Sequence, residues 1–282
     1  MPVHLLILLV FTILAPFAHA QTPLRVMTLN AEWLWTPHDG KADGEQVKQR
    51  DPSAQDYARE LDFYVVLIRQ QQVSLVALSE IEHGDVAADL AQKLGAPWQS
   101  YFIQGRDTAT GQDVAILSRI PVIPGSVTTL DFPEGRLPGD KKGKRLSKFL
   151  ALQLELDGQK VAVLTAHLLS KRNDNPKKSL DRKRQAQAMV DAVNRMRQHT
   201  SRIILLGDMN ATQNTEELAI LQDNGRLQVA EQVCANVRIK PLRSTVDQVL
   251  FEGFTCPEYQ RVDLQQFSDH EAIVVILESG RI

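Results

Sequence analysis

The sequence predicts a single α/β domain whose strands pair in both parallel and antiparallel directions. Three observations support this class. Short apolar runs alternate with helix-spaced runs, one strong hairpin signal joins two of the strands, and 43% of the 282 residues are hydrophobic. That fraction is enough for a packed core, and no internal repeat or low-complexity linker interrupts the chain. Two cysteines are too few for a disulfide-dense scaffold or a zinc ribbon.

Periodicity and turn residues assign each element in turn. Runs of strand length predict buried strands, and apolar residues three or four positions apart predict helices. Gly95-Ala96-Pro97 ends the second helix, Asp157-Gly158 marks the hairpin, and Ser179 or Asp181 would cap the third helix. The expected helices are Gln55–Gln72, Val86–Leu94 and a long helix that runs to about Arg197. The expected strands are Leu24–Asn30, Ser74–Ser79, Asp113–Leu117, Phe149–Leu156, Lys160–Ala166, Ile203–Leu206, Val246–Phe251 and Ala272–Leu277.

Residues 1–20 are expected to be a secretory signal peptide. Leu5 to Leu14 form an apolar run that is too short to span a bilayer, and Ala18-His19-Ala20 supplies small residues for cleavage. The preceding residues lack Lys and Arg, so a retained membrane anchor is the alternative. The mature domain would then cover residues 21–282, be exported to the periplasm or the extracellular space, and have no stable membrane insertion. In that oxidising compartment, Cys234 and Cys256 would form either a disulfide or two buried thiols.

Charge is distributed unevenly along the chain. The formal net charge is −2, but residues 136–184 hold 14 Lys+Arg and five Asp+Glu, a local net charge of +9. Such a segment could contact the phosphates of a nucleic acid. Ordinary solvated loops and a charged helix face are the alternative explanation.

Polar residues follow or precede most of the predicted strands, where ligand sites of α/β sheets lie. Their carboxylate and amide oxygens suit Mg²⁺ or Ca²⁺, and no HExxH, CxxC, P-loop, GxGxxG or GxSxG motif is present. A hard cation with two histidines favours hydrolysis at phosphorus. The candidates are Asn30, Glu32, Glu80, Glu82, His167, Asp208, Asn210, Asp247, Asp269 and His270.

Seven motifs taken together resemble the endonuclease/exonuclease/phosphatase superfamily, which has the fold of deoxyribonuclease I. They follow the family's order over residues 25–275, and GDMN and the terminal SDH are the most specific. The resemblance implies a four-layer sandwich of two mostly antiparallel, mixed β-sheets flanked by helices. The motifs are RVMTLNAEW (Arg25–Trp33), LVALSEIE (Leu75–Glu82), DVAILSRIPV (Asp113–Val122), TAHL (Thr165–Leu168), LLGDMNAT (Leu205–Thr212), STVDQVL (Ser244–Leu250) and SDHEAI (Ser268–Ile273).

The resemblance also implies a metal site. Glu80 would be the main ligand, Asn30 and Glu32 would lie beside it, and Asp269 would assist the metal or the neighbouring histidine. Mg²⁺ is the expected cofactor, with Mn²⁺ or Ca²⁺ as alternatives. The family's usual Gln before the metal-binding Glu is replaced here by Ser79.

Five further residues would have catalytic roles by the same resemblance. Asp208 and Asn210 would orient the attacking water and the phosphate. His270, oriented by Asp247, would act as general base or bind the phosphate, and His167 would stabilise the phosphorane or assist the leaving group. A histidine at this last position is similar to deoxyribonuclease I and the secreted sphingomyelinases, whereas apurinic-site nucleases carry Tyr nearby.

Other polar and aromatic residues are interpreted as structural. Glu82 is expected to be a surface charge at a helix start, and His83 and His199 to be surface residues. Trp33 and Trp35 are expected to pack in the core or a loop, although stacking on a substrate ring is an alternative.

The expected function is that of a secreted or periplasmic, divalent-metal-dependent phosphodiester hydrolase. A nuclease that holds DNA or RNA through segment 136–184 is favoured, and a monomer is expected. The first alternative is a sphingomyelinase-like or other lipid or small-molecule phosphodiesterase or phosphatase, although the polar loop Gly105–Gln112 does not suit membrane insertion. The second alternative is a binding module that keeps the fold without catalysis.

Overall fold

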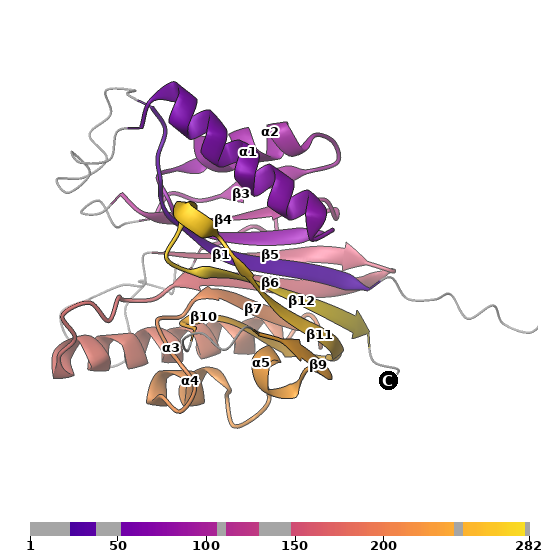
Figure 1. Ribbon diagram of the computed structural model, residues 1–282. Helices are drawn as coiled ribbons and strands as arrows, with labels where there is room; N and C mark the ends of the chain where they lie inside the picture. The colour runs from indigo at the N-terminus through magenta and orange to yellow at the C-terminus, as the bar shows by residue number, and fades with distance from the viewer. Residues whose placement is uncertain (1–22, 38–51, 106–110, 130–147, 240–244, 280–282) are drawn as a thin grey trace, which may run out of the picture.

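Two mixed β-sheets lie face to face at the centre of the molecule (Figure 1). The computed structural model describes residues 23–37, 52–105, 111–129, 148–239 and 245–279. In spatial order, the seven-stranded sheet consists of β3 (Gln99–Phe102), β4 (Asp113–Ser118), β2 (Leu75–Ile81), β1 (Leu24–Leu34), β12 (Glu271–Ser279), β11 (Phe254–Asp263) and β9 (Asn236–Arg238). The five-stranded sheet consists of β5 (Phe149–Leu156), β6 (Gln159–His167), β7 (Ile203–Asp208), β10 (Asp247–Glu252) and β8 (Gln228–Val229).

Most neighbouring strands in both sheets are antiparallel. The parallel pairs are β1 with β2, β9 with β11, and β6 with β7. Asp157 and Gly158, both at positive φ, make the predicted hairpin turn between β5 and β6. The prediction of mixed sheets is therefore confirmed.

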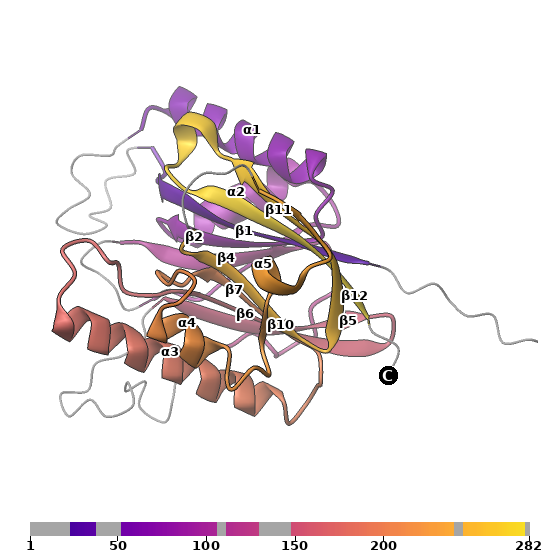
Figure 2. The same cartoon turned by 60° about the horizontal axis from the view of Figure 1, so that its bottom comes forward.

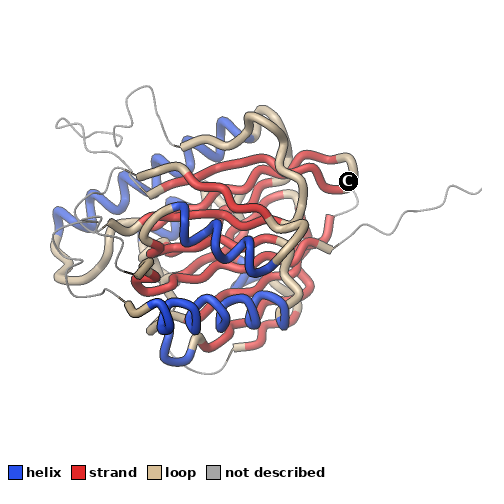
Figure 3. Tube along the Cα trace, turned by 90° about the horizontal axis from the view of Figure 1, so that it is seen from above, coloured by secondary structure: helices blue, strands red, loops and turns tan. Residues whose placement is uncertain are grey.

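Helices cover the outer face of each sheet (Figures 1 and 2). The helices α1 (Ala54–Gln70) and α2 (Gly84–Leu94) lie against the seven-stranded sheet, whereas α3 (Pro176–Met196) and α4 (Glu216–Leu221) lie against the five-stranded one. Seen from above, helices lie over the strands of the sandwich (Figure 3). Two short helices, α5 (Ala230–Val233) and the 3₁₀ helix η2 (Gln265–Phe267), complete the described secondary structure. Among the described helices, none combines the length and the apolar character that crossing a bilayer requires.

Alternation of side chains along the strands produces three hydrophobic cores. In β1, Val26 faces the core between the two sheets, while Met27 faces the core beneath α1 and α2. In β7, Leu206 joins the core between the sheets, and Leu205 joins the core beneath α3 and α4. Three cores between four layers confirm the predicted sandwich.

The start of α3 differs from the prediction. The helix begins at Pro176, and the side chain of Asn175 accepts hydrogen bonds from the backbone N–H groups of Lys177 and Lys178. Capping by Ser179 or Asp181 was wrong, because Asn175 already satisfies these donors and Pro176 has no N–H that needs a partner.

A disulfide joins Cys234, directly after α5, to Cys256 in β11. Their Cα atoms are 4.7 Å apart, and the bond closes a loop across 22 sequence positions. Within this loop the chain passes from β9 in the seven-stranded sheet to β10 in the five-stranded sheet and returns to the seven-stranded sheet at β11. The disulfide therefore fixes a crossing between the two sheets, and of the two alternatives for these cysteines the structure has the disulfide.

Removing this bond should lower the free energy of unfolding by about 3 kcal/mol, since a loop of this length loses that much closure entropy in the unfolded chain. Urea unfolding of the wild type, with and without a reductant, measures the change. The double variant Cys234→Ala/Cys256→Ala should already be destabilised and insensitive to the reductant. An unchanged urea midpoint after complete reduction would contradict this expectation.

Candidate active site

The site lies at one end of the sandwich, where side chains from both sheets meet. In the five-stranded sheet, His167 pairs with Asp208 across β6 and β7, and Asp247 pairs with Asp208 across β10 and β7, so three polar side chains lie at one level. Gly207 permits this register because its φ is +142° and a Cβ there would collide with the carbonyl oxygen of Ala166. The GDMN motif therefore needs glycine at position 207, because the backbone of β6 lies too close to leave room for a side chain.

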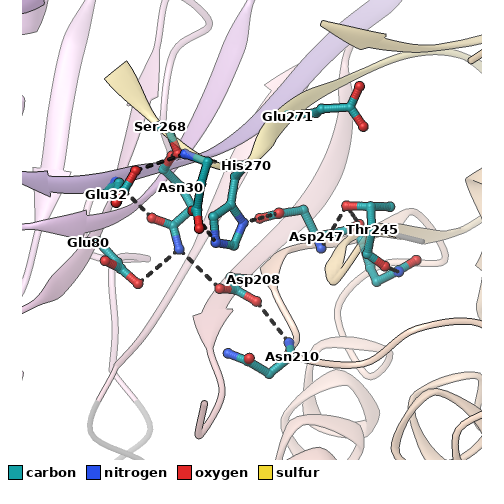
Figure 4. Close-up of polar contacts among 12 residues, drawn as sticks. Asn30, Glu32, Glu80, Asp208, Asn210, Thr245, Asp247, Ser268, His270 and Glu271 are labelled. Atoms are coloured by element: carbon teal, nitrogen blue, oxygen red, sulfur yellow. Dashed lines mark hydrogen bonds and ion pairs between the residues drawn. The ribbon is translucent and has the colours of Figure 1, made fainter. Parts of the chain in front are cut away.

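Asn30 connects the two sheets at the centre of the site (Figure 4). Its Nδ2 donates to Glu80 Oε1 and to Asp208 Oδ2, both at 3.0 Å. Its Oδ1 accepts a hydrogen bond from the backbone N–H of Glu32 at 2.9 Å, and the whole residue is buried. These contacts fix the orientation of the amide, with its oxygen toward Glu32 and its nitrogen toward the two carboxylates.

His270 and Asp247 form a close pair at the other side of Asp208. His270 Nδ1 lies 2.6 Å from Asp247 Oδ2, and Asp247 is buried at the start of β10. Ser268 Oγ donates to the carbonyl of Asn30 at 2.8 Å and accepts from the backbone N–H of His270 at 3.1 Å. Because the acidic oxygen faces Nδ1, the imidazole presents Nε2 on its far side (Figure 4).

Charge on the neighbouring carboxylates controls the titration of His270. Burial by itself lowers the pKa of this imidazole, but the hydrogen bond and charge of Asp247 and the charge of Asp208 outweigh it and raise the pKa to about 10. In the protein without metal, His270 is therefore an imidazolium at neutral pH. Of the two roles suggested for His270, general base or phosphate-binding group, this positive charge favours phosphate binding.

The stability of the metal-free protein should consequently depend on pH above neutrality. A histidine whose folded pKa exceeds the unfolded value of about 6.5 stabilises the fold fully below that value, and the contribution disappears as the pH rises through about 10. Thermal unfolding in EDTA should therefore show a falling Tm across this window. His270→Asn should make the decline shallower, whereas His199→Asn, at an exposed position, should leave it as in the wild type. A parallel decline in all three proteins would contradict the expectation.

His167 faces the same carboxylates from β6. Its Nε2 lies 3.5 Å from Asp208 Oδ2 and 3.8 Å from Glu80 Oε1. Ligand atoms of Glu80, His167 and Asp208 all lie within 4.8 Å of one another, and so do those of Asp208, Asp247 and His270. Asp208 belongs to both groups and is the centre of the acidic cluster.

These residues fit a divalent cation. Burial raises the pKa of Glu80, and burial together with the charge of Asp247 raises the pKa of Asp208 to about 7. Burial also raises the pKa of Asp247. Two buried carboxylates and that of Glu80, whose side chain is 14% exposed, thus crowd one small space, and a cation beside Glu80 and Asp208 would relieve their repulsion. Carboxylate oxygens with an adjacent imidazole suit Mg²⁺ or Mn²⁺.

Glu32 and Asp269 lie at the rim of the site and belong to neither group. The backbone N–H of Asp269 donates to Glu32 Oε2 at 2.8 Å, which ties the loop before β12 to β1. The Asp269 side chain is 74% exposed, and its Oδ1 lies 3.6 Å from His270 Nε2. Of the two partners suggested for Asp269, the structure places it beside the histidine.

Asn210 is buried next to Asp208, but its amide is engaged with the loop after β6. Its backbone N–H donates to Asp208 Oδ1 at 2.9 Å. Its Nδ2 donates to the carbonyl of Leu168 at 2.9 Å, and its Oδ1 accepts from the backbone N–H of Lys171 at 3.3 Å. Asn210 therefore holds this loop against the acidic cluster.

Sequence reasoning missed three buried residues that touch the site. Gln112 Nε2 donates to Glu80 Oε2 at 2.6 Å, Lys148 Nζ donates to Gln112 Oε1 at 3.0 Å, and Ser268 joins Asn30 to His270. Ser268 stands in the SDH motif and could have been found there. Gln112 and Lys148 belong to no motif and were considered only as parts of a polar loop and a basic segment.

The interpretation of Glu82 as a surface charge was wrong. Glu82 is 4% exposed, and its Oε2 accepts hydrogen bonds from the backbone N–H and hydroxyl of Thr36, which anchors the chain after β1. His83 is not a plain surface residue either, because its Nδ1 accepts from the backbone N–H of Asp85 and caps α2. Trp35 is buried and its ring lies beside that of Trp33, which agrees with the prediction that these residues pack within the protein.

The described part of the basic segment is less open than its charge suggested. Arg182 is 1% exposed and binds Glu217 Oε1 at 3.0 Å and Asp174 Oδ2 at 2.7 Å, while Lys183 pairs with Glu216. Residues 136–147 of the segment lie outside the described residues. The DRKR motif is therefore mostly a structural ion-pair network that joins α3 to α4 and to the loop before α3.

Residues 27–270 match the Endonuclease/Exonuclease/phosphatase family. The chain belongs to this family. It is accordingly a phosphoesterase. Enzymes of this family use divalent metals, and the side-chain groups around Asp208 could bind one. No match was found among curated proteins.

Solved structures share the fold at low sequence identity. The chain is similar to a mannosyl-6-phosphatase from Bacteroides thetaiotaomicron, with a TM-score of 0.65, 13% identity and coverage of 90% of this chain and 99% of that one. It is also similar to the human Nocturnin catalytic domain with bound sulfate, with a TM-score of 0.64, 17% identity and coverage of 92% of this chain and 96% of that one. A third similar structure is sphingomyelinase C from Streptomyces griseocarneus, with a TM-score of 0.62, 16% identity and coverage of 92% of this chain and 100% of that one. These likenesses confirm the fold class.

Proposed function

We propose that the protein is an exported, Mg²⁺-dependent phosphodiester hydrolase and that its preferred substrate is nucleic acid. The main support for hydrolase activity is one hydrogen-bonded cluster of side chains, formed by Asn30, Glu80, Asp208, Asp247 and His270. A cluster of buried acids on one side and an imidazolium on the other can hold a cation and a phosphate together.

Each side chain in the cluster has a distinct task in this proposal. Glu80 and Asp208 would hold the cation, which when bound supplies neutralisation of charge on the phosphate oxygens. Asp208 also faces the space between the two groups, where an attacking water would be oriented. His270, held by Asp247, would donate Nε2–H to a phosphate oxygen, and His167 would do so from the opposite side.

The loop after β6 supports nucleic acid as the substrate. Asn210 fastens this loop beside Asp208 through Leu168 and Lys171. Lys171 is half-buried and Arg172 exposed, so two cations lie on a segment that is hydrogen-bonded to the site. A polymer of phosphates passing through the site would meet them on one side, whereas a small phosphoester is too short to reach far along the loop.

Export is supported by two separate features. The apolar run before the domain is typical of a signal peptide, and the disulfide between Cys234 and Cys256 suits an oxidising compartment. Mass determination of the protein secreted from its native cell would test cleavage after Ala20.

A panel of phosphoesters tests the substrate. The purified protein should cleave DNA or RNA in MgCl₂ and lose this activity in EDTA. The mannosyl-6-phosphatase and sphingomyelinase C similarities make a sugar phosphate and sphingomyelin liposomes the necessary competitors. Cleavage of either competitor without cleavage of nucleic acid would replace our proposal with that alternative. No hydrolysis of any ester by the folded protein in Mg²⁺ or Mn²⁺ would leave only the binding module.

The double substitution Lys171→Ala/Arg172→Ala should weaken nucleic-acid binding and reduce its salt dependence, by about one unit of log–log slope for each phosphate that the variant no longer neutralises. Hydrolysis of a small chromogenic phosphodiester should stay near the wild-type rate, because the loop backbone that meets Asn210 is unchanged. Binding measured from 50 to 200 mM NaCl gives the slope. Lys93→Ala, in a surface ion pair with Asp62, serves as the control. An unchanged slope would remove this loop from the proposed binding surface.

A further inference from the structure

Gln112 and Lys148 form a buried polar pair that reaches Glu80 from the side opposite Asn30. Gln112 directly precedes β4 in the seven-stranded sheet, and Lys148 directly precedes β5 in the five-stranded sheet. They are 6% and 9% exposed. The backbone carbonyl of Lys148 accepts from the N–H of His167 at 3.1 Å, which places it beside another site residue. The pair is thus a second polar link between the sheets at the site.

The donors and acceptors in this pair can be arranged in only one way. Lys148 has donors alone, so the atom of Gln112 that lies 3.0 Å from its Nζ must be the carbonyl oxygen. The amide nitrogen of Gln112 must then face Glu80, and it lies 2.6 Å from Glu80 Oε2. Because Lys148 fixes the orientation of the amide, Glu80 always meets an N–H donor.

Glu80 needs such support. Its backbone has a φ of +59° within β2, at a point where the register with β4 shifts, so the strand ladder does not by itself fix the side chain. Asn30 Nδ2 holds Oε1 and Gln112 Nε2 holds Oε2. Two donors on different oxygens determine both the position and the plane of the carboxylate.

We propose that Gln112 and Lys148 are positioning residues that preorganise the Glu80 carboxylate for the divalent cation, with Lys148 acting mainly by fixing the Gln112 amide. This inference rests on the proposed metal-dependent function. Partners of this kind behind a metal ligand commonly contribute 10–100-fold to metal affinity.

Metal binding by the purified full-length protein tests the inference directly. Calorimetric titration with MnCl₂ should give Kd values roughly 10–100-fold higher for Gln112→Met and for Lys148→Met than for the wild type. Met matches the length of Gln, is one atom shorter than Lys, and has no N–H donor. Lys148→Arg keeps a donor toward Gln112 Oε1 and should restore most of the affinity. Lys93→Met, a surface substitution, should bind as the wild type does.

The double variant Gln112→Met/Lys148→Met separates positioning from general damage. If Lys148 acts through Gln112, the double variant should bind no more weakly than Gln112→Met alone, whereas independent effects would add. Circular dichroism checks that each protein is folded. If a Met variant does not fold, the Mn²⁺ affinities of Lys148→Arg and Gln112→Asn test the positioning role instead. Gln112→Asn, which is too short to reach Glu80, should bind weakly.

Failure of the inference is distinguishable from failure of the proposed function. A wild type that neither binds Mn²⁺ nor hydrolyses any ester would overturn the function itself. A wild type that binds Mn²⁺, together with folded Gln112 and Lys148 variants whose Kd lies within twofold of it, would overturn only the positioning role. Additive losses in the double variant would overturn the coupling between the two residues.

Discussion

Replacing Asp208 with Asn should lower turnover at least as much as the roughly 10²–10⁴-fold that a single proton-transfer group contributes, because Asp208 would both hold the cation and orient the attacking water. Asp208 is the carboxylate shared by both possible ligand groups, and it lies 2% exposed between Asn30 and Asp247. Asn has nearly the same shape and can still accept from one of the two donors to Asp208, Asn30 Nδ2 or the backbone N–H of Asn210, so the fold should be retained while the charge is lost. Steady-state kcat on a phosphodiester at saturating MgCl₂ measures the effect.

A matched substitution controls for the loss of any acidic group. Asp191→Asn changes a carboxylate on α3 that accepts from Gln187, away from the acidic cluster, and should leave kcat unchanged. Equal turnover of the wild type and Asp208→Asn would contradict the role assigned to Asp208.

His270→Ala should be comparably severe. The imidazole is the group that the 2.6 Å contact with Asp247 orients, and its removal leaves Asp247 buried without its cationic partner. Turnover should fall by roughly 10²–10⁴-fold, and added imidazole should restore part of it, because an imidazolium ion can occupy the space vacated by the side chain and donate to the phosphate in its place. Rates with and without imidazole provide the measurement.

A structural explanation would predict a different pattern for His270→Ala. A variant that merely unfolded would show a lower Tm and no response to imidazole. If both His270→Ala and Asp208→Asn turned over substrate at the wild-type rate, the assigned roles would be wrong.

The central strands were predictable from the sequence because they are buried on both faces. Runs such as Ile203–Leu206 and Leu75–Leu78 have no polar interruption, and period and length suffice to recognise them. β11 was missed because Pro257 and several charged residues interrupt its apolar pattern, while its pairing with β12 is long-range. The edge strands β3, β8 and β9 and the short helices α4 and α5 were also missed, since two to six residues give too little periodicity.

Site residues were predictable from the sequence where they belong to a motif that lies at the end of a predicted strand. Asp208 follows an apolar run, Asp247 begins β10 and His270 directly precedes β12, so strand ends alone bring them together. Gln112 and Lys148 could not be found in this way, because their roles depend on which side chain lies opposite in the other sheet. Glu82 was misjudged for the same reason, since only the fold places Thr36 against it.

The bond from Asn30 to Asp208 has a consequence for when the protein becomes active. The two residues are 178 positions apart and belong to different sheets, so neither half of the chain contains a complete site. Hydrolytic activity therefore requires that the two sheets have docked. Recovery of activity on refolding should therefore lag behind recovery of secondary structure.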